Sequence, residues 1–194
     1  MHGVGPKLVI GILWLVWLVV WTVASLWSKP AQWQESPVSR WLHVGPLVLA
    51  SLLLSLRLFR FGRYVPFLMV RFLPSGPVPG WIGVALATAG MMLGVWARAH
   101  IGDNWSGNVT VKEGHALVTT GPYAAIRHPI YTGLLLAVLG TALAIGEWRG
   151  IIALALVAVA FVRKLRVEEA RMSETFPEYE AYRRRTAALI PFVW

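Results

Sequence analysis

The sequence predicts an all-α integral membrane protein with about five transmembrane helices. Of its 194 residues, 57% are hydrophobic and only 14% are charged, whereas a soluble domain is about half apolar and about a quarter charged. Apolar stretches long enough to cross a bilayer recur along the chain. The eleven tryptophans fit anchoring of such helices at the membrane interface. Together these observations exclude a soluble globular domain.

The first three predicted spans lie in the N-terminal half. Residues 8–27 carry no charge, and because they show no clear signal-peptide cleavage site we expect a retained span. Residues 41–59 and 80–98 form the second and third spans. Gly90 and Gly94 in the third span are small residues four apart, which favours close packing of helices over a defined dimer face.

The fourth and fifth predicted spans are residues 131–146 and 149–165. Each is somewhat short for a transmembrane helix. Glu147, Trp148 and Arg149 interrupt the apolar run between them. The pattern therefore predicts a tight helical hairpin.

The distribution of positive charge predicts the orientation in the membrane. With five spans, the 28–40 loop, the 99–130 loop and the C-terminal tail lie on one face, which holds most Lys and Arg residues. Positive residues concentrate on the cytoplasmic side, so we expect this face to be cytoplasmic. The net charge of +9 then reflects topology and contact with membrane lipids, and predicts no nucleic-acid partner.

One polar segment precedes the fourth span. Residues 115–133 combine His, Tyr, Arg, Pro and Gly. Pro122 and Pro129 resist helix and restrict the residues before them, which predicts an extended, turn-rich loop. Such a loop suits a ligand with an aromatic base and a charged end.

A second polar segment follows the fifth span. Lys164 lies four residues before Glu168, so both occupy one helix face; an interfacial salt bridge is the alternative to a functional carboxylate, which is costly near a membrane unless paired or used. Arg183–Arg185 is typical of a patch facing lipid headgroups. Tyr179 and Tyr182 are predicted to pack rather than to react.

Several classes of site are not predicted. The absence of cysteine excludes disulfides and thiolate ligands. His100, His115 and His128 lack the spacing of a zinc site, so we predict no metal. The chain carries no phosphate-binding loop, dinucleotide fingerprint or nucleophile elbow.

The motif G-P-Y-x-x-x-R-H-P-x-Y-x-G, from Gly121 to Gly133, resembles the signature of isoprenylcysteine carboxyl methyltransferases and their prokaryotic relatives. The resemblance covers roughly residues 95–194. Five further motifs fit it: N-W-S at Asn104–Ser106, H-x-L-V at His115–Val118, E-E-x-x-M at Glu168–Met172, F-x-x-Y-x-x-Y-x-x-R at Phe176–Arg185, and Pro191-Phe192.

The resemblance implies an integral membrane methyltransferase that uses S-adenosylmethionine. It implies one domain over residues 1–194, with N-terminal spans in 1–94 and a catalytic core in 95–194. The cofactor pocket would be cytosolic, formed by the 99–130 loop and the C-terminal tail. The cofactor-binding residues implied are His115, Ala116, Leu117, Val118, Tyr123, His128, Pro129, Ile130, Tyr131 and Glu168.

Three roles are assigned within this expectation. Glu168 would hold the polar end of the cofactor. Arg127 would meet the cofactor carboxylate, which is our own inference from charge. Lys164, with Arg163 beside it, stands where family members place an Arg that faces the substrate carboxylate, so these two are the expected catalytic residues.

The expected acceptor is amphipathic and lies in the membrane, most simply the carboxylate of a prenylated cysteine or a similar lipid acid. A carboxylate is ionised at neutral pH, so its O-methylation needs no general base. The alternatives are a phospholipid or amine N-methyltransferase, a membrane reductase that binds NADPH, and a non-catalytic assembly or transport component. The sequence makes no prediction of oligomeric state.

Overall fold

The computed structural model describes residues 5–26, 36–55, 64–102, 105 and 117–191. Within these residues the elements are helical, and no strand is present. The predicted all-α fold is confirmed. The long helices are α1 (Pro6–Ser25), α2 (Pro37–Ser55), α3 (Pro77–Ile101), α4 (Pro129–Ile145) and α5 (Trp148–Thr175). The short ones are α6 (Tyr179–Arg185) and the 3₁₀ turns η2 (Pro66–Met69) and η4 (Gly121–Ala124).

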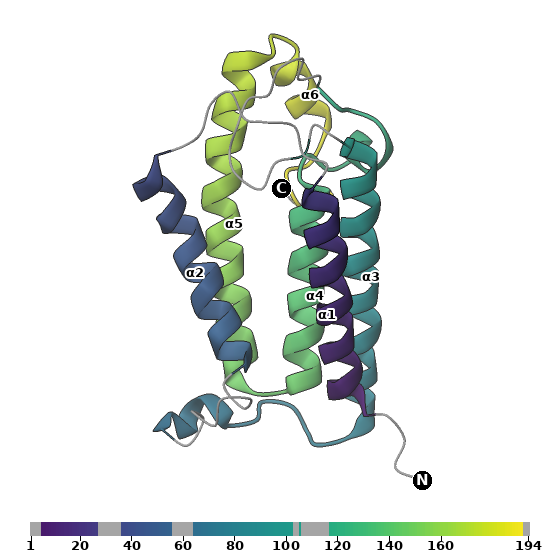
Figure 1. The fold of residues 1–194 in the computed structure, drawn as a ribbon, viewed down its shortest axis with the longest axis vertical. Coiled ribbons are helices and arrows are strands. Elements are labelled where there is room, and N and C mark those ends of the chain that lie inside the picture. Colours follow the sequence, from purple (N-terminus) through teal and green to yellow (C-terminus); the bar gives the residue numbers. More distant parts are fainter. Residues whose placement is uncertain (1–4, 27–35, 56–63, 103–104, 106–116, 192–194) are drawn as a thin grey trace.

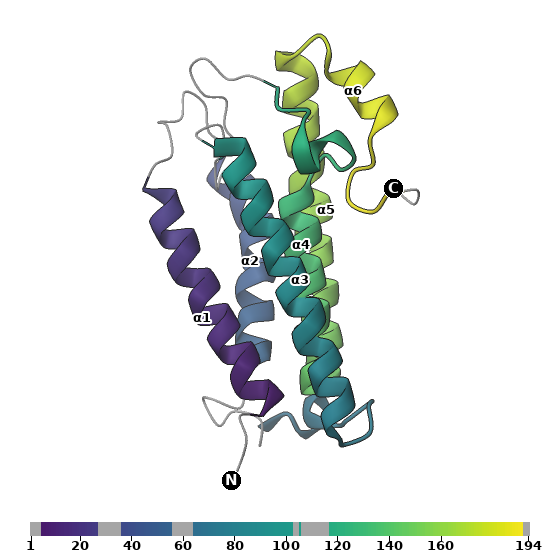
Figure 2. The ribbon, with the colours of Figure 1, turned by 90° about the vertical axis from the view of Figure 1, so that its right-hand side faces the viewer.

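The long helices lie alongside one another, with α6 at one end of the molecule (Figure 1). Figure 2 shows α1 and α6 on opposite sides of the bundle. By length and composition, α1, α2 and α3 can each cross a membrane, and α4 is a shorter apolar helix. Large apolar side chains are exposed along α1, including Leu15 and Leu18. An apolar outer surface of this kind is what a bilayer requires.

Small residues bring α3 and α4 into close contact. A Cβ added at Gly90 would meet the backbone oxygen of Gly133, and one added at Gly83 would meet that of Gly140. A side chain at any of these positions would collide with the opposite backbone. The prediction that Gly90 serves helix packing is therefore confirmed within one chain, and Gly94 in turn faces the ring of Trp17 on α1.

The remaining helices pack onto this pair. On α2, Ala50 forms a buried cluster with Val157 and Phe161 of α5. On α1, the indole of Trp14 donates a 2.9 Å hydrogen bond to Thr141 Oγ1 of α4. The first two helices are therefore attached to the helices that carry the polar segments.

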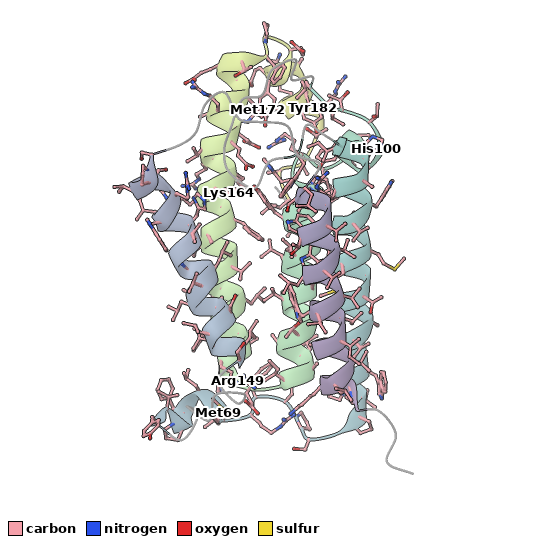
Figure 3. The ribbon with its side chains drawn as sticks, in the orientation of Figure 1. Met69, His100, Arg149, Lys164, Met172 and Tyr182 are labelled. Atoms are coloured by element: carbon pink, nitrogen blue, oxygen red, sulfur yellow. The ribbon has the colours of Figure 1, made fainter. Side chains whose placement is uncertain are left out.

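The turn between α4 and α5 contains a buried ion pair. Arg149 Nε lies 2.7 Å from Glu147 Oε2, and Glu147 is fully buried. Arg149 also donates to the carbonyl oxygens of Leu53 and Leu54 at the end of α2. The predicted break in the apolar run thus locks the hairpin against α2, at the end of the molecule opposite Lys164 (Figure 3).

Two helix boundaries differ from the predictions. Helix α4 begins at Pro129 instead of residue 131, because proline is well suited to the first turn of a helix. Helix α5 continues to Thr175, beyond the predicted end of the fifth span at residue 165. Its last ten residues are rich in Arg, Glu, Ala and Met, which favour helix even where they are no longer apolar.

Candidate active site

The C-terminal tail pairs with the loop before α4. The backbone N–H of Arg127 donates to Ala187 O (2.8 Å), and that of His128 donates to Ala188 O (3.1 Å). The N–H of Ala187 donates back to Ala125 O (3.0 Å). These bonds hold the tail and the start of α4 together, so polar side chains from both can converge on α5.

Glu168 lies at the centre of the cluster. The hydroxyl of Tyr131 donates a 2.6 Å hydrogen bond to Glu168 Oε1. His128 Nδ1 lies 3.5 Å from Glu168 Oε2, and Lys164 Nζ lies 3.9 Å from Oε1. The side chains of Glu168 and Lys164 are 17% and 11% exposed. The carboxylate is therefore mostly removed from water but retains an open edge.

The neighbouring Glu169 is tied to the loop and the tail. Arg127 Nε donates to Glu169 Oε1 over 2.7 Å, and His128 Nε2 lies 3.3 Å from the same oxygen. Arg183 of α6 lies 3.7 Å from Glu169 Oε2. Arg127 also donates to the carbonyl oxygens of Arg183 and Thr186. Glu169 and Arg127 thus join α5, the loop and the tail.

These contacts shift the ionisation of the cluster. Burial acts to raise the pKa of the Glu169 carboxyl, but hydrogen bonds from His128 and Arg127 outweigh it and hold that pKa at about 2. Burial also opposes ionisation of Glu168, yet His128 and Lys164 keep its pKa below the ordinary value. Burial acts to lower the pKa of His128, and its bonds to both carboxylates raise that pKa instead. His128 therefore bridges two carboxylates that favour its protonated form.

Parallel rings support this arrangement. The rings of His128 and Tyr131 stack with centroids 5.4 Å apart, and those of Tyr131 and Phe161 stack at 4.6 Å. Lys164 Nζ lies 5.4 Å from the centroid of the Tyr131 ring, a cation–π distance. The Tyr131 ring, whose hydroxyl donates to Glu168, is thus held by stacking with His128 and Phe161.

An apolar cluster adjoins the carboxylates. Ala97, Tyr123 and Ile130 are buried together, and Val118 packs against them. Gly121 precedes Tyr123 with a φ of +59°, and a side chain there would meet the ring of His100. Glycine suits both the left-handed backbone and the close contact. The G-P-Y motif therefore places the Tyr123 ring in this cluster.

The tail adds a second apolar cluster. Phe176, Tyr179 and Tyr182 are buried together, and Leu117 packs against them. The hydroxyl of Tyr182 donates to Tyr123 O over 2.7 Å. The expectation that Tyr179 and Tyr182 pack is borne out by their burial, and they anchor the tail beside the loop.

The structure brings together most of the predicted site residues. Arg127, His128, Tyr131, Lys164 and Glu168 form one cluster. Val118, Tyr123, Ile130 and the fully buried Pro129 lie in or beside the adjoining apolar cluster, and Leu117 contacts the second one. These contacts leave their cofactor-binding roles as predictions. His115 and Ala116 lie outside the described residues.

Arg163 lies apart from the cluster. Its Nη2 is 3.4 Å from Ser39 Oγ on α2, whereas Lys164 contacts Glu168. Sequence reasoning also missed Glu169, to which it gave no role, and the contribution of Arg183. The adjacent Glu168-Glu169 pair was the only signal for Glu169, because its partners lie in distant parts of the chain.

A match to a protein family shows which proteins this chain is related to. The family model described as phospholipid methyltransferase matches residues 78–179, which include α3, α4, α5 and the loop before α4. The chain belongs to this family. The match contains both sides of the cluster, from the loop and from α5, and it begins at α3.

Curated relatives extend the comparison. The chain is 38% identical over 117 residues to a nickel-cobalt-cadmium resistance protein of Alcaligenes xylosoxydans xylosoxydans, covering 57% of this chain and 52% of that protein. It is 34% identical over 101 residues to protein-S-isoprenylcysteine O-methyltransferase of Schizosaccharomyces pombe, covering 50% of this chain and 43% of that protein. The chain thus spans about half the length of the curated relatives it matches.

A solved structure shares the fold. It is a eukaryotic intramembrane Ras methyltransferase, an isoprenylcysteine carboxyl methyltransferase, with 22% identity and a TM-score of 0.50. The match covers 84% of this chain and 55% of that one. The predicted resemblance to isoprenylcysteine carboxyl methyltransferases is therefore confirmed, as is the membrane fold.

Proposed function

We propose that this protein is a membrane methyltransferase that transfers the methyl group of S-adenosylmethionine to an amphipathic acceptor in the bilayer. The observation that carries the proposal is the convergence of His128, Tyr131 and Lys164 on Glu168. These residues come from two polar segments that flank the last long helices. The membership of this chain in the phospholipid methyltransferase family supports the same chemistry.

The donor set fits the proposed cofactor. S-adenosylmethionine, when bound, supplies a methyl group carried on a sulfonium. Glu168 would hold its ammonium group, because the carboxylate is kept ionised and mostly buried. The rings of His128, Tyr131 and Tyr123 would flank its base. Leu117, Val118, Pro129 and Ile130 would supply apolar lining. His115 and Ala116, which lie outside the described residues, would also line the cofactor.

Arg127 is proposed to act on the cofactor carboxylate only through a free edge of its guanidinium. Its Nε and Nη1 already donate to Glu169 and to carbonyls of the tail. The main role of Arg127 in this arrangement is structural, because its bonds connect the loop before α4, the tail and α5. Its proposed contribution is therefore to hold the tail closed over the cofactor and to exclude water.

Lys164 is the proposed acceptor-side residue. It lies one helical turn before Glu168, toward the apolar part of α5, and its ammonium is 3.9 Å from Glu168 Oε1. A positive charge there attracts a carboxylate acceptor and aligns it with the donor. No residue needs to remove a proton from an acceptor that is already ionised. The placement of Arg163 beside α2 supports Lys164 alone for this role.

The acceptor proposed is the carboxylate of a prenylated cysteine or a similar lipid acid. The activity named for the Schizosaccharomyces pombe relative supports it, as does the charge of Lys164. Methylation of a phospholipid or amine nitrogen is the second candidate, since the matching family is described as phospholipid methyltransferase. We propose that the site faces the cytoplasm, in line with the distribution of Lys and Arg.

Incubation of the purified protein with methyl-labelled S-adenosylmethionine tests this function. A prenylated cysteine and phosphatidylethanolamine are offered as separate acceptors. We expect label on the prenylated cysteine that alkali releases as methanol, because a methyl ester is base-labile. Alkali-stable label on the phospholipid would favour N-methylation. Absence of label with both acceptors, together with absence of cofactor binding, would favour a non-catalytic role.

A further inference from the structure

A second feature lies on a face of α5 that does not carry Lys164 or Glu168. A hollow of about 730 Å³ is lined by residues of α5 between Ala158 and Glu174. Neither Lys164 nor Glu168 is among its lining residues. Residues three and four apart share a helix face, so this hollow, here called the α5 outer groove, lies on a different face of α5 from the carboxylate cluster.

The groove changes from apolar to basic along the helix. Ala158, Val159 and Val162 line one part of it, and the other part contains Arg163, Arg166 and Arg171. From Val159 to Arg171 the helix rises roughly 18 Å. The change occurs where the predicted fifth span ends, at residue 165. An elongated apolar surface with guanidinium groups at the membrane boundary matches the shape and charge of a phospholipid.

Two of the arginines have capacity for an anion. The buried Nε of Arg163 has no hydrogen-bond partner among the described residues, and its Nη2 makes only a long 3.4 Å contact to Ser39. The exposed Arg166 has no carboxylate partner in the part of the chain that the structure describes. Glu174, the carboxylate of the groove, pairs with Arg171 at 2.6 Å. Arg163 and Arg166 therefore face no competing anion inside the groove.

We propose that the α5 outer groove binds an anionic phospholipid. The guanidinium groups of Arg163 and Arg166 hold its phosphate, because Arg presents several donors in a planar fork that matches phosphate oxygens. Its acyl chain lies along Ala158, Val159 and Val162. This lipid binds on a different face of α5 from Lys164 and Glu168 and is distinct from the methyl acceptor.

Native mass spectrometry of the full-length protein in detergent tests the proposal. Phosphatidylglycerol and phosphatidylcholine with identical acyl chains are titrated separately. The variant Arg163→Gln/Arg166→Gln is compared with Arg184→Gln/Arg185→Gln, which removes the same charge from the exposed end of α6. We expect a preference for phosphatidylglycerol that falls about 30-fold in the groove variant, because each basic residue near a membrane surface contributes about fivefold. Arg184 and Arg185 belong to the patch predicted to face headgroups but do not line the groove, so the α6 variant measures a general effect of headgroup-facing charge and should keep the preference.

The single variant Arg166→Gln keeps the test decisive if the double variant misfolds. Arg166 is exposed, so this variant should keep its helical circular dichroism and lose about fivefold of the preference. Equal losses in the groove and α6 variants would overturn the proposal, since they would show a general charge effect. So would equal binding of both lipids, or complete displacement of phosphatidylglycerol by millimolar inorganic phosphate.

Discussion

The hydroxyl of Tyr131 lies 2.6 Å from Glu168 Oε1, although the two residues are 37 positions apart in the sequence. Tyr131 belongs to the family motif and lies in the first turn of α4, and Glu168 lies beyond the apolar part of α5. The contact exists because the α4–α5 hairpin returns the chain to the same end of the bundle. It joins the two polar segments into one candidate site.

Replacement of Tyr131 tests whether this hydrogen bond orients Glu168. Tyr131→Phe keeps the ring stack with His128 and Phe161 and removes only the donor. We expect the dissociation constant for S-adenosylhomocysteine, measured by calorimetry, to rise about tenfold, because a hydrogen bond to a charged group contributes about 1.5–3 kcal/mol. Tyr64→Phe, at an exposed position outside the cluster, is the control. Unchanged affinity in Tyr131→Phe would remove the hydroxyl from the account.

Replacement of Lys164 separates acceptor binding from cofactor binding. Lys164→Ala should lower methyl transfer to a prenylated cysteine by about 30-fold or more, because a buried charge partner is worth at least about 2 kcal/mol. Affinity for S-adenosylhomocysteine should change much less. The control is Arg184→Ala, which removes an exposed charge of the tail. A loss confined to cofactor affinity would contradict the role proposed for Lys164.

The loss of stability at acidic pH tests the ion pairs by which Glu169 joins α5 to the loop before α4 and the tail. Its folded pKa is about 2, against an ordinary value of 4.5, so the stabilisation is present above pH 4.5 and is lost as the pH falls toward 2. Glu169→Gln should lower the free energy of unfolding at pH 6 by about 3 kcal/mol. The difference from wild type should shrink at pH 3. Thermal unfolding in detergent measures it, and a difference that stays constant over this range would argue against these ion pairs.

His128 has the opposite pH dependence, which sets the range of that measurement. Its pKa is raised above 6.5, so the stability that it contributes is complete below pH 6.5 and is lost as the pH rises through the folded value. At pH 6 and below this contribution is close to complete and changes little. The change in unfolding free energy below pH 6 therefore reports on Glu169 rather than on the imidazole of His128.

The contact between α3 and α4 predicts a strong effect from one added methyl group. Gly90→Ala places a Cβ against the backbone of Gly133, and backbone atoms cannot move aside cheaply. We expect a loss of about 1–3 kcal/mol in unfolding free energy. The matched control is Gly11→Ala on α1, where nothing lies within 4 Å of the added Cβ. Equal stability of the two variants would show that this helix contact is not close.

Much of the fold could be predicted because its signals are local. Apolar runs marked five helices, and Pro122 marked a turn before α4, whereas Pro129 was expected in the loop and instead begins that helix. The four-residue spacing of Lys164 and Glu168 placed them on one face, and the structure puts them 3.9 Å apart. Each of these inferences depends on residues within a few positions of one another.

Most of the missed features depend on contacts between distant residues. Arg127 and Glu169 are 42 positions apart and meet only because the tail docks on the loop before α4. The contacts of Arg149 with the end of α2 likewise span 95 positions or more. Periodicity and composition carry no information on such pairs. The extension of α5 was missed because hydropathy marks the end of a membrane span and not the end of a helix.

Titration of the protein with S-adenosylhomocysteine by calorimetry tests the central claim, that Glu168 and its neighbours form the cofactor site. Wild type should bind, and Glu168→Ala should lose binding by about 100-fold or more while remaining folded, because it removes the partner of a mostly buried ammonium. Glu174→Ala, which removes an exposed carboxylate from the same helix, should bind as wild type does. Equal affinity of the wild type and Glu168→Ala would contradict the account.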